Sequence, residues 1–300
     1  MHKAINFLII TTNPNVYAAK QLENHIEKEG HLINICSPKS LEIDTLKSAD
    51  IIINRNTGLN YSDKDLELIE EVLRPDKQLL TNSPNCSRIL RDKLRQAEYL
   101  RSLIPNENLI TTYSLLEYQK ALIDSPEQRK WIIKTRRGQK AKGIHSSVDL
   151  EKDAKDLMAK GDHNYIIQPY FPLSREIRVL ILKSLDSKHS KLIYLEKRPL
   201  DKKSPFYILN FENSSPSLIK DNQVPKVIKE LVGIIINSQL DFHFITIDFL
   251  EDENAMIKLL EINSSPGLEG VSNLLQKQSN STNIIETYLQ YLKSDFNRLV

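Results

Sequence analysis

The stretch MIKLLEINSSPGLEG, residues 256–270, begins as a buried strand and ends with polar side chains at alternate positions. Side chains two residues apart in a strand point to one face of the sheet, so Glu261 and Asn263 face the same way. An apolar run at 244–250 precedes them, and the turn-rich segment EDEN at 251–254 predicts that the two runs form a hairpin. The pattern therefore places a carboxylate and an amide side by side at the end of a strand.

A second carboxylate belongs to the same predicted hairpin. If the chain turns near residue 254, Asp248 lies almost across from Glu261. The two carboxylates and the amide oxygen of Asn263 then converge, and like charges so close are costly unless a cation lies between them. Oxygen donors in small number suit Mg²⁺, which shares its coordination shell with waters and nucleotide phosphates. A solvated strand end with a capping asparagine is the alternative that these residues leave open.

A basic loop follows another predicted strand. The segment IIKTRRGQKAKGI, residues 132–144, places Lys134 at the end of an apolar run and then continues with Gly138 and Gly143. The chain has only eight glycines in 300 residues, so two in one short loop indicate a need for backbone freedom there. A lysine beside such a loop is typical of a backbone that closes over phosphates. A solvated basic loop is the alternative.

The N-terminal part of the chain alternates between strand and helix patterns. Residues 4–10, 31–36, 49–55 and 78–80 read as strands, and the segments between them include helical patterns up to Gly30 and at 63–74. This order predicts a small α/β domain with a parallel sheet. It contains no G-x-G-x-x-G motif, which argues against a dinucleotide site.

Beyond residue 82 the pattern changes twice. Residues 83–104 predict one helix that begins near Ser83 or Ser87 and ends before Pro105. From residue 131 onward strand patterns dominate, with a predicted hairpin formed by 176–184 and 191–198. The predicted helices of this half lie at 224–238 and 283–296.

Composition narrows the class of protein. The hydrophobic content is 40% and the net charge is +2, from 41 basic and 39 acidic residues, which gives no nucleic-acid footprint. No run approaches the ~20 apolar residues of a membrane span, so we expect a cytoplasmic protein without a membrane partner. Cys36 and Cys86 lack metal-ligand spacing and are expected to be reduced and structural. No Ser/His/Asp or Cys/His constellation suggests a side-chain nucleophile.

Six motifs occur in an order that is similar to one known family. They are RDKLR (91–95), the basic loop (132–143), IIQPYF (166–171), EIRVLIL (176–182), EKR (196–198) and EINSSPGLEG (261–270). The last is the most specific, with its Glu-x-Asn pair followed by Ser-Pro-Gly-Leu-Glu-Gly. In these motifs, over nearly the whole chain, the sequence resembles the RimK-type ligases of the ATP-grasp superfamily.

The resemblance implies a fold of mixed α/β and α+β class. A Rossmann-like pre-ATP-grasp domain at residues 1–88 would precede a two-lobed ATP-grasp fold with antiparallel sheets. Its central lobe, 89–168, would carry the phosphate-binding flap, and its C-terminal lobe, 169–300, would carry the metal site.

The resemblance also implies site residues. Asp248, Glu261 and Asn263 match the ligands of Mg²⁺, with two ions expected and Mn²⁺ as an alternative metal. Arg178 and Arg198 match arginines that point into the reaction site. The nucleotide positions comprise phosphate-contacting lysines, flap glycines, the hinge on which adenine sits and an acidic residue that binds the ribose hydroxyls. They are Lys93, Lys134, Gly138, Gly143, Gln168, Pro169, Tyr170, Phe171 and Glu176.

The implied activity is that of an ATP-dependent carboxylate–amine ligase that forms an amide through an acyl phosphate. Its partners would be ATP, an amino-acid or other carboxylate donor and an amine acceptor, which in this family is a protein, a carrier or a small molecule. The family usually adds glutamate or another amino acid. The family often forms dimers or tetramers, so a homo-oligomer is consistent with the resemblance.

Three departures from the family pattern keep other functions open. Pro169 stands where the hinge usually has Glu, although its carbonyl and the N–H of Tyr170 could still serve adenine. Ala141 replaces a flap glycine, and the segment 201–217 lacks the arginines expected near the acyl phosphate. A pseudoenzyme that binds nucleotide or a partner without ligation is therefore the main alternative. An unrelated α/β binding protein would require all six motifs to be accidental.

Overall fold

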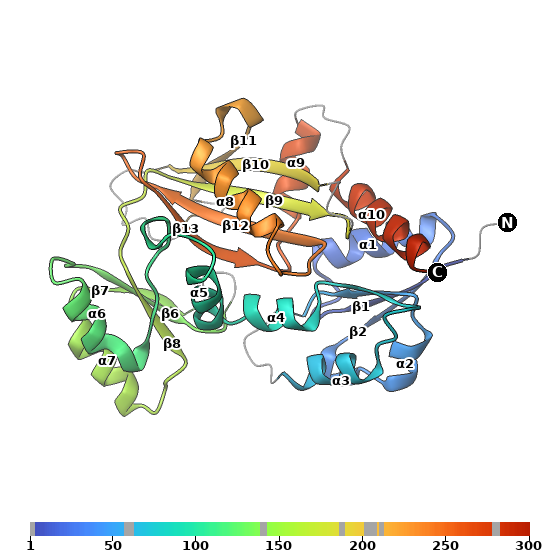
Figure 1. Ribbon diagram of the computed structural model, residues 1–300, viewed down its shortest axis with the longest axis horizontal. Coiled ribbons are helices and arrows are strands. Elements are labelled where there is room, and N and C mark those ends of the chain that lie inside the picture. Colours follow the sequence, from blue (N-terminus) through green and yellow to red (C-terminus); the bar gives the residue numbers. More distant parts are fainter. Residues whose placement is uncertain are drawn as a thin grey trace.

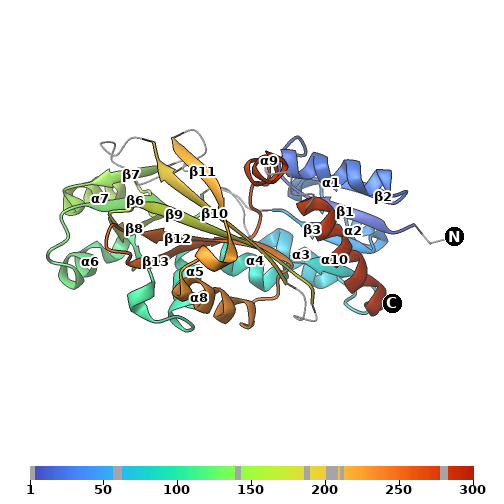
Figure 2. The same ribbon diagram turned by 90° about the horizontal axis from the view of Figure 1, so that it is seen from above.

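The computed structural model describes residues 4–56, 63–138, 143–185, 190–200, 209, 213–277 and 283–300. Within this part of the chain the strands form three sheets, arranged one after another along an elongated molecule (Figure 1). Both termini lie at the end that carries the parallel sheet, and Figure 2 shows the two antiparallel sheets following toward the other end. The predicted fold class is confirmed, whereas the predicted boundaries at residues 88 and 168 stay predictions.

The first sheet is the parallel sheet expected from the N-terminal alternation. Its strand order is β2-β1-β3-β4, and all neighbours run parallel. The strands are β1 (Asn6–Ile10), β2 (Leu32–Cys36), β3 (Ile51–Asn54) and β4 (Leu79–Thr81). The helices between them are α1 (Tyr17–Lys28), α2 (Ile43–Ser48) and α3 (Lys64–Val72).

Helices cover both faces of the parallel sheet. Phe7 and Ile9 of β1 pack with α1 and with α10 (Ile284–Leu299), while Leu8 and Ile10 face the side of α2 and α3. This alternation follows from the period of two in a strand, and it explains why β1 is apolar at nearly every position. The C-terminal helix thus covers one face of the parallel sheet together with α1, and Figure 1 shows α10 beside α1.

The second sheet has five antiparallel strands in the order β11-β10-β9-β12-β13. They are β9 (Arg175–Lys183), β10 (Ser190–Pro199), β11 (Ser214–Ile219), β12 (Phe244–Glu251) and β13 (Ile257–Asn263). Both predicted hairpins are confirmed, because β9 pairs with β10 and β12 pairs with β13.

One face of this five-stranded sheet is apolar along its length. Residues such as Val179, Ile247 and Leu259 point to it and pack with α8 (Lys226–Ile236), α4 (Pro84–Leu90) and α5 (Lys93–Arg101). On the other face, Leu180 and Phe244 pack toward the parallel sheet. The remainder of that second face carries the polar side chains of the candidate site.

The third sheet has the order β5-β8-β6-β7 and is antiparallel. Its strands are β5 (Tyr113–Ser114), β6 (Trp131–Thr135), β7 (Ile144–Ser147) and β8 (Tyr165–Pro169). Trp131, Ile133 and Ile167 point to one face and pack with α6 (Tyr118–Asp124) and α7 (Leu150–Ala159). The alternate residues, Lys134 and Gln168 among them, therefore point to the opposite face.

The single helix predicted for 83–104 is wrong, since the structure divides it into α4 and α5. Asp92 has an extended backbone, and its side chain accepts hydrogen bonds from the N–H groups of Leu94 and Arg95 at 3.1 and 3.3 Å. Aspartate is a preferred N-cap because its carboxylate satisfies these otherwise unpaired donors. A new helix therefore begins at Lys93 and ends at Arg101.

Further short elements lie outside the sequence prediction. They include α2, α6, α7, β5, β7, β11 and α9 (Glu269–Lys277). Among the helices in the described ranges, none has both the length and the apolar character needed to cross a membrane.

Asn82 joins the parallel sheet to the five-stranded sheet. It follows β4 with a left-handed backbone, φ 54°, and is almost fully buried. Its amide donates to the carbonyls of Phe244 and Ser264 at 3.0 and 2.7 Å and accepts from the N–H groups of His243 and Phe244 at 3.1 and 3.4 Å. One side chain thus holds the start of β12 and the segment after β13.

We expect Asn82→Gly and Asn82→Ala to separate the two contributions of this residue. Both changes remove the hydrogen bonds and should lower the free energy of unfolding by about 3 kcal/mol. Ala should cost about 1 kcal/mol more, because only Gly adopts the left-handed backbone without strain. Urea unfolding of the two variants measures this difference, and equal stabilities would show that the backbone there is unstrained.

Candidate active site

The hairpin of β12 and β13 brings the predicted metal-site residues together. Asp248 pairs directly with Glu261, and Thr246 pairs with Asn263, so these side chains share one face of the sheet. The Asn263 amide donates to Asp248 Oδ2 and to Glu261 Oε1, each at 3.2 Å. The amide therefore lies between two carboxylates that would otherwise repel each other.

Arg178 extends this row of side chains by one strand. It pairs with Asp248 across β9 and β12, and its Nε and one terminal nitrogen donate to the two carboxylate oxygens at 2.6 and 2.7 Å. Such a bidentate pair is among the strongest charge-assisted contacts. Burial disfavours the charged guanidinium, but Asp248, together with Glu176 and Glu261, outweighs burial and raises the pKa of Arg178.

Glu176 and Lys197 form a second buried pair on the same face. The two residues are direct partners across β9 and β10, and the Lys197 ammonium contacts Glu176 Oε1. Lys197 also donates to the carbonyl of Leu209 at 2.9 Å. Burial, with the nearby Asp248 charge, raises the pKa of Glu176. Because Glu176 is already paired within the protein, a ribose would have to compete with Lys197 for it.

Arg198 does not join this cluster. Neighbouring residues in a strand point to opposite faces, so Arg198 points away from the face that carries Lys197. Its side chain is 53% exposed and pairs with Glu196 at 3.0 Å. The structure thus brings Arg178 to the site and leaves Arg198 on the opposite face of the sheet.

Two lysines approach Glu261 from other elements. Lys134, at the end of β6, lies 3.6 Å from Glu261 Oε2 and is nearly fully buried. Burial and repulsion from Lys93 lower the pKa of Lys134, although Glu261 opposes the shift. Burial favours the neutral form of Glu261, but Lys134, Lys93 and the Asn263 amide outweigh it and lower its pKa to about 2. Glu261 is therefore ionised throughout the physiological range.

The predicted flap is described at its two ends. The Lys93 ammonium donates to the carbonyl of Gly138 at 3.0 Å. Gly143 has φ +71°, and a Cβ added there would lie 2.7 Å from Cγ2 of Thr135, so this position requires glycine. Residues 139–142, which include Ala141, lie outside the described residues.

The hinge residues are placed at the end of β8. Gln168 is buried, and its amide donates to Oγ1 of Thr112 at 2.8 Å. Pro169 pairs with Trp131, and the N–H of Tyr170 donates to the carbonyl of Lys130 at 3.0 Å. The N–H that was expected to bind adenine therefore already donates to the residue that precedes β6. Phe171 follows as a half-buried residue.

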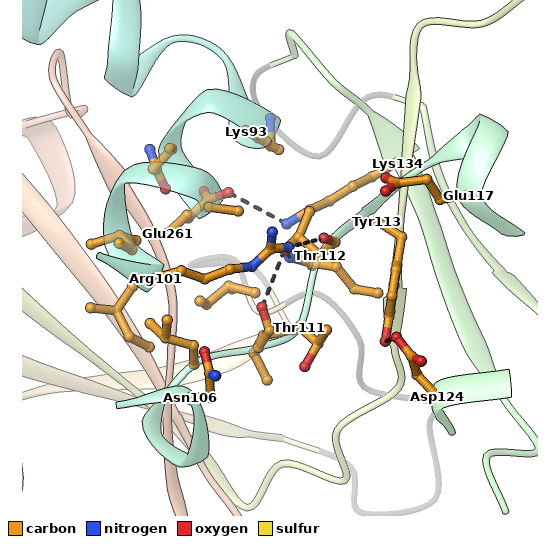
Figure 3. Close-up of a pocket in the computed structure, with 18 of the residues that line it drawn as sticks. Lys93, Arg101, Asn106, Thr111, Thr112, Tyr113, Glu117, Asp124, Lys134 and Glu261 are labelled. Carbon is orange, nitrogen blue, oxygen red and sulfur yellow. Dashed lines mark hydrogen bonds and ion pairs between the residues drawn. The ribbon is translucent and has the colours of Figure 1, made fainter. Parts of the chain in front are cut away.

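A cavity of about 320 Å³ connects these elements. Its walls come from α5, the segment 106–113, β6, β8 and β13, and it is lined in part by Lys93, Arg101, Thr112, Lys134, Gln168 and Glu261. Figure 3 shows the Arg101 side chain reaching into the cavity toward Thr112, whose carbonyl accepts its hydrogen bond. The cavity therefore joins two lysines with one of the hairpin carboxylates.

The donor set suits Mg²⁺. Asp248 and Glu261 offer charged oxygens, and as a ligand Asn263 would contribute its amide oxygen in place of the N–H groups it now donates. Among the described residues, no group of three or more His, Cys, Asp or Glu side chains is placed so that it could hold a metal ion. With two carboxylates and one amide, the site would leave several positions of an octahedral ion to water or phosphate oxygens.

Four residues of the site were not predicted as such. Lys197 lay in the EKR motif, but the choice between it and Arg198 depends on the register with β9. Asp92 and Thr112 act through partners distant in sequence. Gln96 donates to the carbonyl of Ile262 at 2.7 Å and accepts from its N–H at 2.9 Å, so it pairs with the edge of β13 between Glu261 and Asn263.

The segment 201–217 is described only at residue 209 and from residue 213 onward. The lysines and the asparagine at 202, 203 and 210 that could replace its missing arginines lie outside the described residues. Asn213 accepts at its carbonyl from the N–H of Leu200 at 3.2 Å.

Arg178→Met and Arg198→Met should differ sharply in stability. Loss of Arg178 leaves Asp248 without its bidentate partner in a buried setting, so we expect a loss of about 3 kcal/mol in the free energy of unfolding. Loss of the exposed pair of Arg198 should change it by less than about 1 kcal/mol. Urea unfolding of both variants provides the comparison, and a stable Arg178→Met would contradict this account of the charge row.

Known structures share this arrangement of sheets, while sequence comparison finds no relative. No protein-family model matches the chain, and no curated protein is significantly similar to it in sequence. D-alanyl-alanine synthetase A from Vibrio cholerae is 14% identical with a TM-score of 0.71, covering 99% of this chain and 100% of its own. The ATP-grasp ligase PsnB, complexed with a variant of its minimal precursor, Mg and ADP, is 12% identical with a TM-score of 0.67, covering 97% and 98%.

A third structure has a similar fold. N5-carboxyaminoimidazole synthetase from Staphylococcus aureus, complexed with ADP, is 17% identical with a TM-score of 0.62, covering 87% of this chain and 70% of its own. The three proteins differ in the reactions their names describe but agree in architecture. The chain has the ATP-grasp fold.

Proposed function

We propose that this protein is an ATP-dependent ligase that joins a carboxylate to an amine through an acyl phosphate. The observation that carries the proposal is the cavity lined by Glu261, Lys93 and Lys134, with Asp248 and Asn263 beside Glu261 on the same face of the hairpin. A hairpin with oxygen ligands for a metal, facing two lysines, suits the phosphates of a nucleoside triphosphate. The fold shared with synthetases and ligases supports the same reaction class.

The nucleotide would bind in the cavity between the two antiparallel sheets. Lys93 and Lys134 line it and would neutralise phosphate oxygens, and Gln168 lies near the hinge where the base is expected. The structures of this fold that contain ADP support a nucleotide ligand. Lys134 is buried and has Glu261 as its nearby counter-charge. Its ammonium would therefore be stabilised further by an anion in the cavity.

Asp248, Glu261 and Asn263 would hold Mg²⁺. The proposal includes two ions, with Mn²⁺ as an alternative metal. When bound, the metal supplies Lewis-acid stabilisation of charge on the transferred phosphoryl group. The lowered pKa of Glu261 keeps its carboxylate ionised for this role at neutral pH.

The proposed reaction has two steps. An oxygen of the substrate carboxylate attacks the γ-phosphorus of ATP, the bond from phosphorus to the β,γ-bridging oxygen breaks, and ADP leaves. The amine then attacks the carbonyl carbon of the acyl phosphate, inorganic phosphate leaves, and the amine loses a proton. Neither step requires a nucleophile from the protein, so catalysis rests on positioning and on electrostatic stabilisation.

Arg178 and Lys197 are two cations on the sheet face beside the hairpin. In the proposed mechanism they oppose the negative charge that accumulates when two anions are held together. Arg178 also holds Asp248 in a fixed orientation through its two hydrogen bonds. Arg198 has no part in this mechanism, because it lies on the opposite face.

The finer features of the proposal come from the motifs. We propose a ligase of the RimK type that adds glutamate or another amino acid to a protein, a carrier or a small-molecule acceptor. It would act in the cytoplasm and as a homo-oligomer. The proposal keeps the division into a leading domain at 1–88, a central lobe at 89–168 and a C-terminal lobe at 169–300.

A nucleotide-binding pseudoenzyme is the second candidate. The observation that favours it is the absence of arginine from 201–217, where the family carries arginines near the acyl phosphate. The preserved hairpin carboxylates and lysines argue for catalysis, because an idle site has no physical need to keep them close.

ADP and phosphate release from the purified protein with Mg²⁺ and ATP tests the proposal. Each amino acid is supplied alone and with a pool of amine acceptors, and products are identified by mass spectrometry. ADP formation that depends on one carboxylate, with a matching mass gain on one acceptor, is the expected result. ATP binding without ADP formation under every combination would favour the pseudoenzyme.

Glu261→Gln should lower Mg²⁺-dependent ADP formation by at least about 100-fold while the protein remains folded, because it removes one charged metal ligand at a strand end. Glu253→Gln, in the exposed turn of the same hairpin, is the matched control and should retain full activity. Coupled-enzyme assay of ADP and circular dichroism measure the two effects. Normal turnover by Glu261→Gln would refute the metal assignment.

A further inference from the structure

The two phosphate-binding lysines belong to different parts of the fold. Lys134 is on β6 of the four-stranded antiparallel sheet, whereas Lys93 begins α5, which packs beside β13 of the five-stranded sheet. Their relative position therefore depends on contacts between the start of α5 and the segment after β6. In the described residues, Lys93 makes two of these contacts, from its N–H to the carbonyl of Arg136 at 3.1 Å and from its ammonium to that of Gly138 at 3.0 Å.

Asp92 makes the other contacts of this junction. Its side chain is fully buried, with 0% exposure. Oδ1 and Oδ2 accept from Nε of Arg136 at 2.7 and 2.9 Å, and Oδ2 accepts from Nε of Arg137 at 3.4 Å. Oδ1 also caps α5 through the N–H groups of Leu94 and Arg95. One carboxylate thus binds the helix that starts at Lys93 and the two arginines that follow β6.

The same junction reaches the N-terminal domain. Asp63, just before α3, lies 3.8 Å from Arg137 and pairs with Arg91 at 2.6 Å and with Arg95 at 3.0 Å. Asp92 is therefore a fully buried member of an ion-pair network that crosses three parts of the chain. Burial favours the neutral form of Asp92, but Arg136 and the backbone donors outweigh it and lower its pKa.

Capping alone does not account for this carboxylate. Asparagine caps a helix about as well as aspartate, so the charge of Asp92 is not needed to start α5. The charge is needed for the arginines, because a buried carboxylate that faces two guanidinium groups forms charge-assisted bonds that an amide cannot match.

We propose that Asp92 is a positioning residue, which holds Lys93 against the base of the phosphate-binding loop and so fixes the spacing of Lys93 and Lys134 around the phosphates. The inference rests on the proposed function, in that it assumes a nucleotide in the cavity. It predicts a defect that is confined to the phosphate end of the ligand.

Calorimetric titration of the full chain with Mg²⁺–ATP and with adenosine tests this role. Asp92→Asn, which keeps the cap and removes the charge, should bind ATP about tenfold more weakly while adenosine affinity stays unchanged. Asp149→Asn, at the N-cap of α7, is the matched control and should bind both ligands as the wild type does.

The partner residue provides an independent variant. Arg136 is partly exposed, so Arg136→Gln should fold even if Asp92→Asn does not. It should reproduce the selective loss of ATP affinity. The double variant should bind ATP at most about twofold more weakly than the weaker-binding single variant, because both changes break the same interaction.

The outcomes separate this inference from the proposed function. If the wild type fails to bind Mg²⁺–ATP, the proposed function is refuted and Asp92 has no phosphates to serve. If the wild type binds ATP and both variants bind it equally well, only the positioning role is refuted. A parallel loss of adenosine affinity would also overturn it, because that result indicates general damage to the cavity.

Discussion

The antiparallel pairing of β12 with β13 is the constraint on which the rest of the site depends. It sets Asp248 directly opposite Glu261 on one face, where two carboxylates at the distance of a cross-strand pair repel each other. Three neighbours of this pair supply positive charge or a donor: Arg178 from β9, the Asn263 amide from β13 and Lys134 from the other antiparallel sheet. The two antiparallel sheets therefore meet at the hairpin carboxylates, whose negative charge these neighbours neutralise. The cavity between the sheets has a charged wall as a result.

The hairpin could be predicted from the sequence because its signals are local. Apolar alternation marks two strands, EDEN marks the turn, and together they fix which side chains share a face. The same alternation shows that Lys197 and Arg198 face opposite ways, but it does not say which of them faces the site. That choice depends on the pairing of Lys197 with Glu176 across β9, a contact between residues 21 positions apart in sequence. The prediction of Arg198 came from the family resemblance, whereas the structure places Lys197 on the face that carries Glu176.

Longer-range contacts explain the other differences. Residues 83–104 have helical periodicity, yet a second helix begins after Asp92, whose carboxylate caps it and also pairs with Arg136 and Arg137, more than 40 positions away. The sequence shows no partner for the N–H of Tyr170. Pairing of β8 with β6 brings it to the carbonyl of Lys130, which accepts its hydrogen bond. In each case a backbone or side-chain group finds a partner that no local pattern encodes. The fold survives such changes, as the 12–17% identity with structures of similar architecture illustrates.

The charges around the cavity also indicate which ligand the site favours. Of the described side chains that interact with one another around the hairpin, four are cationic and three are carboxylates, which leaves one positive charge in excess. The cations are Lys93, Lys134, Arg178 and Lys197, and the carboxylates are Glu176, Asp248 and Glu261. At an effective dielectric of about 20, each charge pair at 4 Å changes the energy by about 4 kcal/mol, so this excess matters. A divalent cation entering alone would increase it, and Arg178 already occupies both oxygens of Asp248. Phosphate groups would reverse the imbalance and offer a metal the further oxygens that the hairpin lacks. In the proposed function, the metal and the nucleotide are therefore one ligand in electrostatic terms, and the surplus of lysine and arginine is what makes their joint binding favourable.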